Sequence, residues 1–260
     1  MKKSIKKKDM QAVIIFVVLF MLFVSGWIVM YKIESAKVRL DENTLCPINK
    51  EVDNHTVVVI DKSDEWEKEA VDGLETFLYK IHQSIPEYGR LSFVVINGDK
   101  GSYTKAVKMF DMCNPGNGEN CNTFFSNPRL LKKRYEESFS QPLKDIIKKL
   151  STPDKAVNSP LFETIAGIID ADDSRHLKIH FVSDLMENGS KFNFYNIIPL
   201  AEQIVKEYTI DTDNSVSIYA HIVERRRHSS DIIEAAKAVW QEYCGRQNIS
   251  FDSKRLMITE

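Results

Sequence analysis

Residues 55–66 read HTVVVIDKSDEW, and this stretch decides the fold. The apolar run VVVI has no polar interruption, which is typical of a strand buried on both faces of a sheet. The run ends on Asp61, and Ser63 and Glu65 follow it closely. Polar side chains at this point either bind a metal ion at the end of the sheet or cap the helix that follows. Both alternatives make predictions about the rest of the chain.

Strand-like and helix-like patterns alternate through the rest of the chain. Strand-like segments occupy residues 56–60, 90–98, 106–112, 177–184, 215–223 and 249–256, and helix-like segments occupy 64–85, 128–150, 159–170, 196–208 and 229–245. We expect Ser159 to cap the helix that begins at Pro160, and Pro142 to kink or split the helix over 128–150. This alternation predicts an α/β fold of the Rossmann type, with a mostly parallel sheet and helices on both faces. No composition break divides it, so we expect one domain over residues 46–260.

The amino-terminal segment has the composition of a membrane-spanning helix. Residues 12–31 carry no charge, and about twenty apolar residues are enough to cross the hydrocarbon core of a bilayer. Lysines are concentrated in residues 1–11, whereas residues 32–45 form a linker of mixed charge, so the amino terminus is expected in the cytoplasm. A cleaved signal peptide is the alternative, but its apolar region is usually shorter and ends in small residues. The sequence therefore predicts a single-pass protein of the inner (cell) membrane whose domain faces the periplasm.

Three polar stretches are expected to meet at the carboxyl edge of the predicted sheet. The first begins at Asp61, directly after the first strand. The second, NSPLFETI, contains Ser159, and the third, FVSDLMENG, contains Asp184. Because open α/β sheets bind ligands beyond the carboxyl ends of their strands, this edge is the candidate site.

These residues resemble the metal-ion-dependent adhesion site of von Willebrand factor A domains. The first motif of that family is Asp-x-Ser-x-Ser, which Asp61 and Ser63 match, with Glu65 in place of the second serine. SPLFETI resembles the family's Thr-Pro-Leu-x-Glu-Ala-Leu, with Ser159 in place of the threonine. VSDLMENG resembles Val-Ser-Asp-Gly, with Asp184 as its acid. The sequence is also similar to membrane-anchored bacterial members of the family.

The resemblance extends from about residue 55 to about residue 256. It implies a von Willebrand factor A-like fold, a bound Mg²⁺ for which Mn²⁺ can substitute, and another protein as partner. Mg²⁺ takes oxygen ligands and keeps several waters, so hydroxyls and carboxylates suit it. Glu65 either ligates the ion or simply begins the next helix, and loss of the metal would leave a purely structural module. The alternative in which Asp61 and Asp184 only cap helices also stays open.

An enzyme is the rival class of function. A metal-dependent hydrolase would use Asp61, Asp184 and Glu65, but the sequence offers no convincing general base. Ser63 has no evident histidine partner for a Ser-His-Asp hydrolase, and the six histidines show no metal-ligand spacing. The net charge of −2 gives no reason to expect nucleic acid, and we identify no small-molecule substrate. We therefore expect a module that binds another protein close to the membrane.

The run ERRRH places Arg225, Arg226 and Arg227 after a predicted strand, at the same edge as the proposed metal site. Three guanidinium groups in this position can clamp a carboxylate or phosphate on a partner. A solvated loop is the more common role of such a run. Partner binding by these arginines is therefore a hypothesis that competes with simple solvation.

The four cysteines are Cys46, Cys113, Cys121 and Cys244, and they lie in the part expected outside the cytoplasm, where disulfides form. Cys113 and Cys121 share a glycine-rich loop, so a local pair is one alternative. If residues 106–112 are the antiparallel edge strand typical of von Willebrand factor A domains, Cys113 ends at the same edge as Cys46, and Cys121 is left for Cys244. Both pairings remain open, as do four reduced thiols.

Overall fold

The computed structural model describes residues 7–36, 38–62, 68–96, 107–119, 127–150, 158–223 and 229–256. The chain divides into two units, Met1–Arg39 and Leu40–Glu260. The first unit contains helix α1 (Lys7–Ala36). Its segment Val13–Lys32 is long and apolar enough to cross a membrane, which fits a single-pass membrane protein.

The second unit is built on one six-stranded sheet of order β3-β2-β1-β4-β5-β6. The strands are β1 (Asn54–Asp61), β2 (Arg90–Ile96), β3 (Val107–Cys113), β4 (His176–Ser183), β5 (Ser215–Ile222) and β6 (Ser250–Arg255). All neighbours pair in parallel except β3, which runs antiparallel to β2 at the edge. The mostly parallel sheet with an antiparallel edge strand confirms the predicted fold class.

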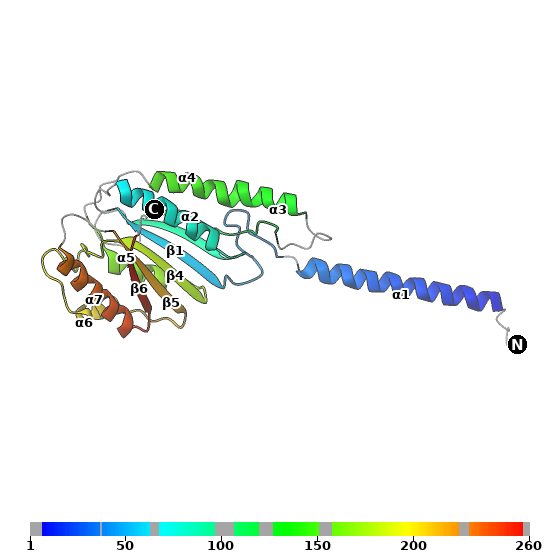
Figure 1. Ribbon diagram of the computed structural model, residues 1–260. Helices are drawn as coiled ribbons and strands as arrows, with labels where there is room; N and C mark the ends of the chain where they lie inside the picture. The colour runs from blue at the N-terminus through cyan, green and yellow to red at the C-terminus, as the bar shows by residue number, and fades with distance from the viewer. Residues whose placement is uncertain are drawn as a thin grey trace. The chain divides into compact units, whose positions relative to one another are not determined.

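Helices cover both faces of this sheet, as Figure 1 shows. On one face lie α2 (Lys68–Ser84), α3 (Pro128–Tyr135) and α4 (Gln141–Leu150), and on the other lie α5 (Leu161–Asp170), α6 (Ala201–Glu207) and α7 (Ser230–Arg246). Each layer buries its own apolar cluster against the sheet, because alternate residues of the strands point to opposite faces.

The predicted interruption of the helix over 128–150 is confirmed, and the structure gives its form. A π-helical turn, Glu136–Ser140, separates α3 from α4. Pro142 follows it in the first turn of α4, where its missing N–H costs little. The wide turn is closed by Gln141, whose backbone N–H donates to the carbonyl of Glu136. The π-helical turn therefore accommodates the proline, and the chain stays helical from α3 into α4.

Stacked aromatic rings fix the helices next to the candidate site. Phe162 of α5 stacks on Trp240 of α7, with ring centroids 3.8 Å apart. The indole Nε1–H of Trp240 donates to the carbonyl of Leu185, just beyond β4, at 3.2 Å. Both rings are fully buried. This contact ties α5, α7 and the end of β4 into one rigid layer.

The structure decides among the cysteine pairings. Cys46 forms a disulfide with Cys113 at the end of β3, which confirms one of the two alternatives. The local pair of Cys113 with Cys121 is therefore wrong, because Cys113 is already bonded. Pairing of Cys121 with Cys244 is wrong as well, because Cys244, on α7, is a free thiol whose side chain is buried in the core. Cys121 itself lies outside the described residues.

Candidate functional site

Asp61 and Ser183 end two neighbouring parallel strands at the carboxyl edge of the sheet. Ile60 of β1 pairs with Val182 of β4, so the next residue of each strand falls at the same level. The hydroxyl of Ser183 donates to Asp61 Oδ2 at 2.8 Å, and both side chains are fully buried. The edge therefore begins with a carboxylate held in a fixed orientation, as an ion-binding site requires.

Asp184 follows directly and shapes the loop after β4. Its Oδ1 accepts the backbone N–H of Met186 at 3.0 Å and also contacts Ser183 Oγ at 3.5 Å. Leu185 between them has a φ of 65°, a left-handed conformation that this tight turn imposes. Asp184 thus stabilises a turn. The alternative in which it caps the next helix is wrong, because α6 begins only at Ala201.

Glu187 caps helix α5 from outside the helix. Its Oε2 accepts the backbone N–H groups of Leu161 and Phe162, at 2.7 and 3.0 Å. Ser159 does not cap this helix, contrary to our expectation, because the cap position falls on Pro160 and no local side chain bonds the first turn. Ser159 instead pairs with Asn188 through two backbone hydrogen bonds of 2.9 Å. The carboxylate of Glu187 therefore takes the capping role that we expected of the Ser159 hydroxyl, at the amino-terminal end of α5, where the helix dipole is positive.

Glu187 and Ser159 leave two buried oxygen atoms unused. Among the residues that the structure describes, neither Glu187 Oε1 nor Ser159 Oγ has a hydrogen-bond partner. Burial, helped by the nearby carboxylate of Asp61 and opposed by its two backbone hydrogen bonds, raises the pKa of Glu187 to about 8. Buried oxygen atoms without partners are costly, so this position suits a ligand that supplies positive charge or hydrogen-bond donors.

Gly189 keeps the space next to Glu187 open. A Cβ at Gly189 would collide with Glu187 Oε1, so any other residue there would displace the carboxylate. Gly189 also donates its backbone N–H to the carbonyl of Phe192 at 3.0 Å, which closes the turn around the carboxylate. Glu187 is therefore held in place by the backbone around it.

The structure places three of the proposed ligands, Asp61, Ser159 and Asp184, in buried positions at the carboxyl edge. Ser63 and Glu65 lie outside the described residues. Within the described ranges, no three His, Cys, Asp or Glu side chains converge as metal ligands. A cation here would therefore have to draw on hydroxyl oxygens, water or a partner in addition to the carboxylates.

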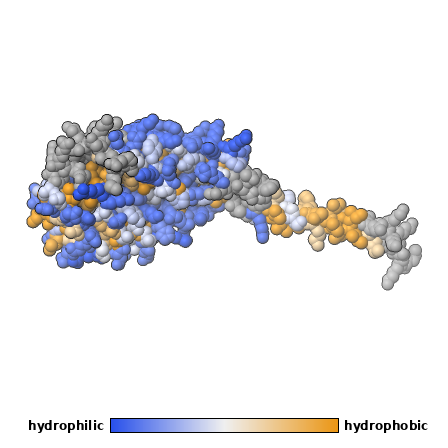
Figure 2. Space-filling view, viewed as in Figure 1, coloured by the Kyte–Doolittle hydropathy of each residue, from blue (hydrophilic) through white to orange (hydrophobic). Residues whose placement is uncertain are grey.

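An exposed apolar loop adjoins this edge. Between β4 and α6, Ile197 and Leu200 are 74% and 73% exposed, and Tyr195 is also exposed. Figure 2 shows hydrophobic surface at the left-hand end of the folded unit, where Figure 1 draws this loop. The loop is held by the hydrogen bond from Asn193 Nδ2 to Asn188 Oδ1, at 3.0 Å. Exposed apolar side chains beside polar ones are typical of protein-binding surfaces.

The proposed arginine clamp cannot be placed in this way. Arg225, Arg226 and Arg227 lie outside the described residues, between β5 and α7. Their role in partner binding stays a hypothesis.

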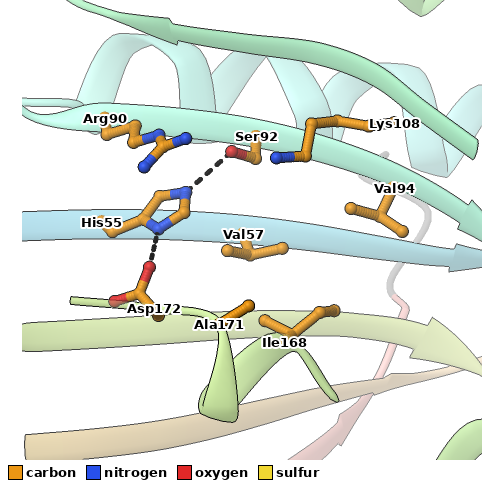
Figure 3. A pocket seen from close by; sticks show the side chains of 9 residues that line it. All are labelled: His55, Val57, Arg90, Ser92, Val94, Lys108, Ile168, Ala171 and Asp172. Carbon is orange, nitrogen blue, oxygen red and sulfur yellow. Dashed lines mark hydrogen bonds and ion pairs between the residues drawn. The ribbon is translucent and has the colours of Figure 1, made fainter. Parts of the chain in front are cut away.

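A second polar cluster lies toward the amino ends of β1 and β2 and was missed by sequence reasoning. His55 of β1, Ser92 of β2 and Asp172 after α5 line a small cavity of about 50 Å³ (Figure 3). His55 Nε2 lies 2.7 Å from Ser92 Oγ, and His55 Nδ1 contacts Asp172 Oδ2. This order of groups is that of a Ser-His-Asp triad, in which the serine hydroxyl must donate its hydrogen bond to the histidine.

The hydroxyl hydrogen of Ser92 is directed away from His55. Ser92 Oγ donates to Asp111 Oδ1 at 2.7 Å, and a hydroxyl has a single hydrogen. Ser92 can then only accept a hydrogen bond from His55. A general base must accept the proton of its nucleophile, so His55 does not activate Ser92 in this arrangement. The cluster is a polar network, and it gives no support to a serine hydrolase.

Asp111 holds this network at its solvent side. Burial by itself raises the pKa of Asp111, but hydrogen bonds from Arg90, Ser92 and Lys108 lower it well below its usual range. Arg90 donates from both Nε and Nη2, at 2.7 Å each, and Lys108 Nζ donates at 2.9 Å. Each cation is therefore already paired with a carboxylate, which leaves no obvious charge for an anionic ligand.

The sequence matches no family model and no curated protein. Among solved structures, the chain is similar to the PilB minor pilin from Streptococcus sanguinis, with 8% identity and a TM-score of 0.44 over 80% of this chain and 58% of that one. It is also similar to an aerotolerance-related membrane protein from Bacteroides fragilis NCTC 9343 carrying multiple mutations to serines, with 10% identity and a TM-score of 0.39 over 77% and 91%. This chain thus spans a little over half the length of the pilin. At these TM-scores, neither likeness carries an argument about activity, ligand or partner.

Proposed function

We propose that this chain is a membrane-anchored module that binds another protein at the carboxyl edge of its sheet, with a divalent cation as the bridge. The observation that carries the proposal is the pair of unused buried oxygen atoms, Ser159 Oγ and Glu187 Oε1, beside two buried aspartates. Burial of several carboxylates close together without a positive charge would destabilise the native state, and a bound cation would offset that cost.

The residues present fit such an ion. Asp61, Ser159 and Asp184 offer carboxylate and hydroxyl oxygens, which are the ligands that Mg²⁺ prefers, and Mn²⁺ accepts the same set. Because no three acidic side chains of the described residues converge as ligands, waters and the partner would complete the coordination, and Glu187, which we did not single out from the sequence, would accept a hydrogen bond from such a water through Oε1. The bound ion would supply an open coordination position for a carboxylate on the partner.

The partner is proposed to touch the exposed loop as well as the ion. A carboxylate at an ion gives orientation, whereas exposed aliphatic and aromatic side chains provide the buried apolar area that stabilises a complex. Tyr195, Ile197 and Leu200 are exposed and held in a fixed loop, so they would need little ordering on binding. We further propose that α1 places this module on the periplasmic side of the inner membrane.

Thermal unfolding of the full-length protein in detergent tests the metal. If Mg²⁺ or Mn²⁺ binds the native state, saturation at a hundredfold excess over Kd should raise Tm by roughly 5 to 10 °C relative to EDTA. Asp61→Ala and Asp184→Ala should each abolish the difference, and the exposed control Asp252→Ala should keep it. Coincident melts of the wild-type protein in Mg²⁺ and EDTA would end the metal proposal.

Affinity capture from the native membrane tests the partner. A true partner should be released by EDTA, and Asp61→Ala or Ile197→Asp should fail to capture it. Capture that is indifferent to EDTA but lost in Ile197→Asp would place binding on the loop alone. Recovery of the bait alone, together with turnover of a small ester or phosphate, would instead favour the hydrolase alternative.

A further inference from the structure

Helix α3 lies at the end of the folded unit where the chain enters from α1. Cys46, close to this entry point, is bonded to Cys113 at the end of β3. The loop that continues from Cys113 packs against α3, because a Cβ at Gly118 would meet Pro128 and Leu131. The disulfide and this contact therefore bring the start of α3 to the margin of the unit where the tether joins it.

The solvent-facing side of α3 is basic, whereas Tyr135 at its end packs on the core layer and its hydroxyl lies 3.0 Å from His82 Nε2. The helix contains four basic residues and no acid, and none of its side chains is buried. The four basic side chains are Arg129, Lys132, Lys133 and Arg134. Among the described ion pairs, Lys133 contacts Glu137 at 3.7 Å, and both side chains are well exposed. The segment thus keeps a net positive charge facing solvent.

Two exposed aliphatic side chains occur at the same margin. Leu130 projects from α3 and is 64% exposed, although Lys133 and Arg134, one helical turn further on, flank it on the helix surface. Ile48 follows Cys46 by two residues and is 68% exposed. Exposure to solvent accounts for the basic side chains of α3. It does not account for the exposed aliphatic side chains that lie among them. Basic and aliphatic side chains together are the composition of surfaces that lie in a membrane interface.

The tether limits how far this margin can lie from a bilayer. Helix α1 ends at Ala36, and the folded unit begins at Leu40. Even fully extended, the chain between these residues covers only about 14 Å. If α1 crosses a membrane, the entry point of the folded unit stays close to the headgroups, within reach of their negative charge.

We propose that α3, with Ile48, forms a surface that docks on anionic phospholipid headgroups of the membrane in which α1 resides. The basic side chains contact phosphate groups, and Leu130 and Ile48 enter the boundary between headgroups and acyl chains. This surface lies at the amino edge of the sheet, away from the carboxyl-edge site, so it does not depend on the proposed function. Docking would leave the carboxyl edge directed away from the membrane.

Hydrogen exchange of the full-length protein in nanodiscs tests this proposal. Because α3 buries no side chain, its amides should exchange by local opening, and docking on lipid should slow that opening. Each basic group at an anionic surface favours docking about fivefold, so we expect at least about tenfold slower exchange in phosphatidylglycerol–phosphatidylcholine discs than in phosphatidylcholine discs. The effect should disappear at about 1 M salt, where the Debye length is about 3 Å.

A matched pair of variants separates docking from stability. Arg129→Glu, Lys132→Glu and Arg134→Glu together should abolish the lipid-dependent slowing, and they leave the Lys133–Glu137 pair in place. The control carries Lys178→Glu, Lys206→Glu and Lys254→Glu, exposed residues outside α3, and should keep the slowing.

Exchange of α7 reports whether each variant remains folded. Equal exchange of α3 in both kinds of disc would overturn the proposal, and so would slowing that survives the α3 reversals in a protein with normal α7 exchange.

Discussion

Replacement of Glu187 by Gln is expected to remove a large pH dependence of stability. Glu187 is buried, and its pKa rises from 4.5 to about 8 on folding. Between these values the native state holds a proton that the unfolded state has released, so stability is fully present below about pH 4.5 and is lost as the pH rises through about 8. Glu187→Gln keeps an oxygen that can accept the two N–H groups of α5, but it cannot ionise.

The size of the effect follows from the shift. Between about pH 6 and pH 9, ionisation of Glu187 in the native state costs roughly 2 to 3 kcal/mol relative to the unfolded chain. Denaturant unfolding of wild type and Glu187→Gln, in EDTA, should therefore diverge by that amount over this range. Taking the difference between the two proteins cancels the other titrating groups. Glu242→Gln, an exposed carboxyl paired with Arg246, is the control and should follow the wild type.

Parallel stability curves for wild type and Glu187→Gln from pH 5 to 9 would refute the reasoning. Such a result would mean that Glu187 is ionised in the native protein over the whole range. The backbone N–H groups of α5 would then outweigh burial in fixing its charge.

Three further predictions concern other parts of the fold. Replacing Cys46 and Cys113 by Ser should lower the free energy of unfolding by about 4 kcal/mol, because the bond closes a long loop in the unfolded chain, and reductant should do the same to the wild type. Ser92→Ala should lower the free energy of unfolding by about 1 to 3 kcal/mol in denaturant. The same variant should leave the turnover of a small ester unchanged, because His55 does not activate Ser92. Burial lowers the pKa of His180 to about 4 and of His221 to about 3. As the pH falls below about 6.5, the unfolded chain binds protons at these residues before the native state does, so the free energy of unfolding should decrease. The variant with both histidines replaced by Gln should lose less stability in acid.

Controls make each of these results decisive. A disulfide effect below about 1 kcal/mol would show that the unfolded chain is already restricted without the bond. For Ser92, Ser217→Ala on the half-buried face of β5 should be nearly neutral, and equal costs would argue against a special network. For the histidines, an acid loss unchanged in the double variant would assign it to other groups.

The strand pattern was predictable because it depends on short-range composition. The run from Val57 to Ile60 has to be buried on both faces, and five of the six strands pair in parallel as alternation of strands and helices requires. The edge strand and its disulfide could be named only as one alternative, since Cys113 had two plausible partners. Chain spacing alone does not distinguish partners that a fold brings together.

The site was only partly predictable, because its contacts span long sequence distances. The cap of α5 comes from Glu187, 26 residues after Leu161, whereas sequence signals for capping look only at neighbouring residues. His55 and Asp172 are 117 residues apart and meet only because the segment that follows α5 lies next to the start of β1. A histidine at the start of an apolar strand was the one signal that could have drawn attention to this network.

The bond between Cys46 and Cys113 also governs how mechanical load would pass through the molecule. A pull on the tether first loads residues Leu40–Leu45 and then divides at Cys46, where one path follows the chain to β1 and the other crosses the disulfide to β3. The pull is then shared by the backbone ladder between β3 and β2, which ruptures as a group. If a partner applies force at the opposite edge of the sheet, the folded unit should stay attached to the tether until the hydrogen bonds between β3 and β2 break.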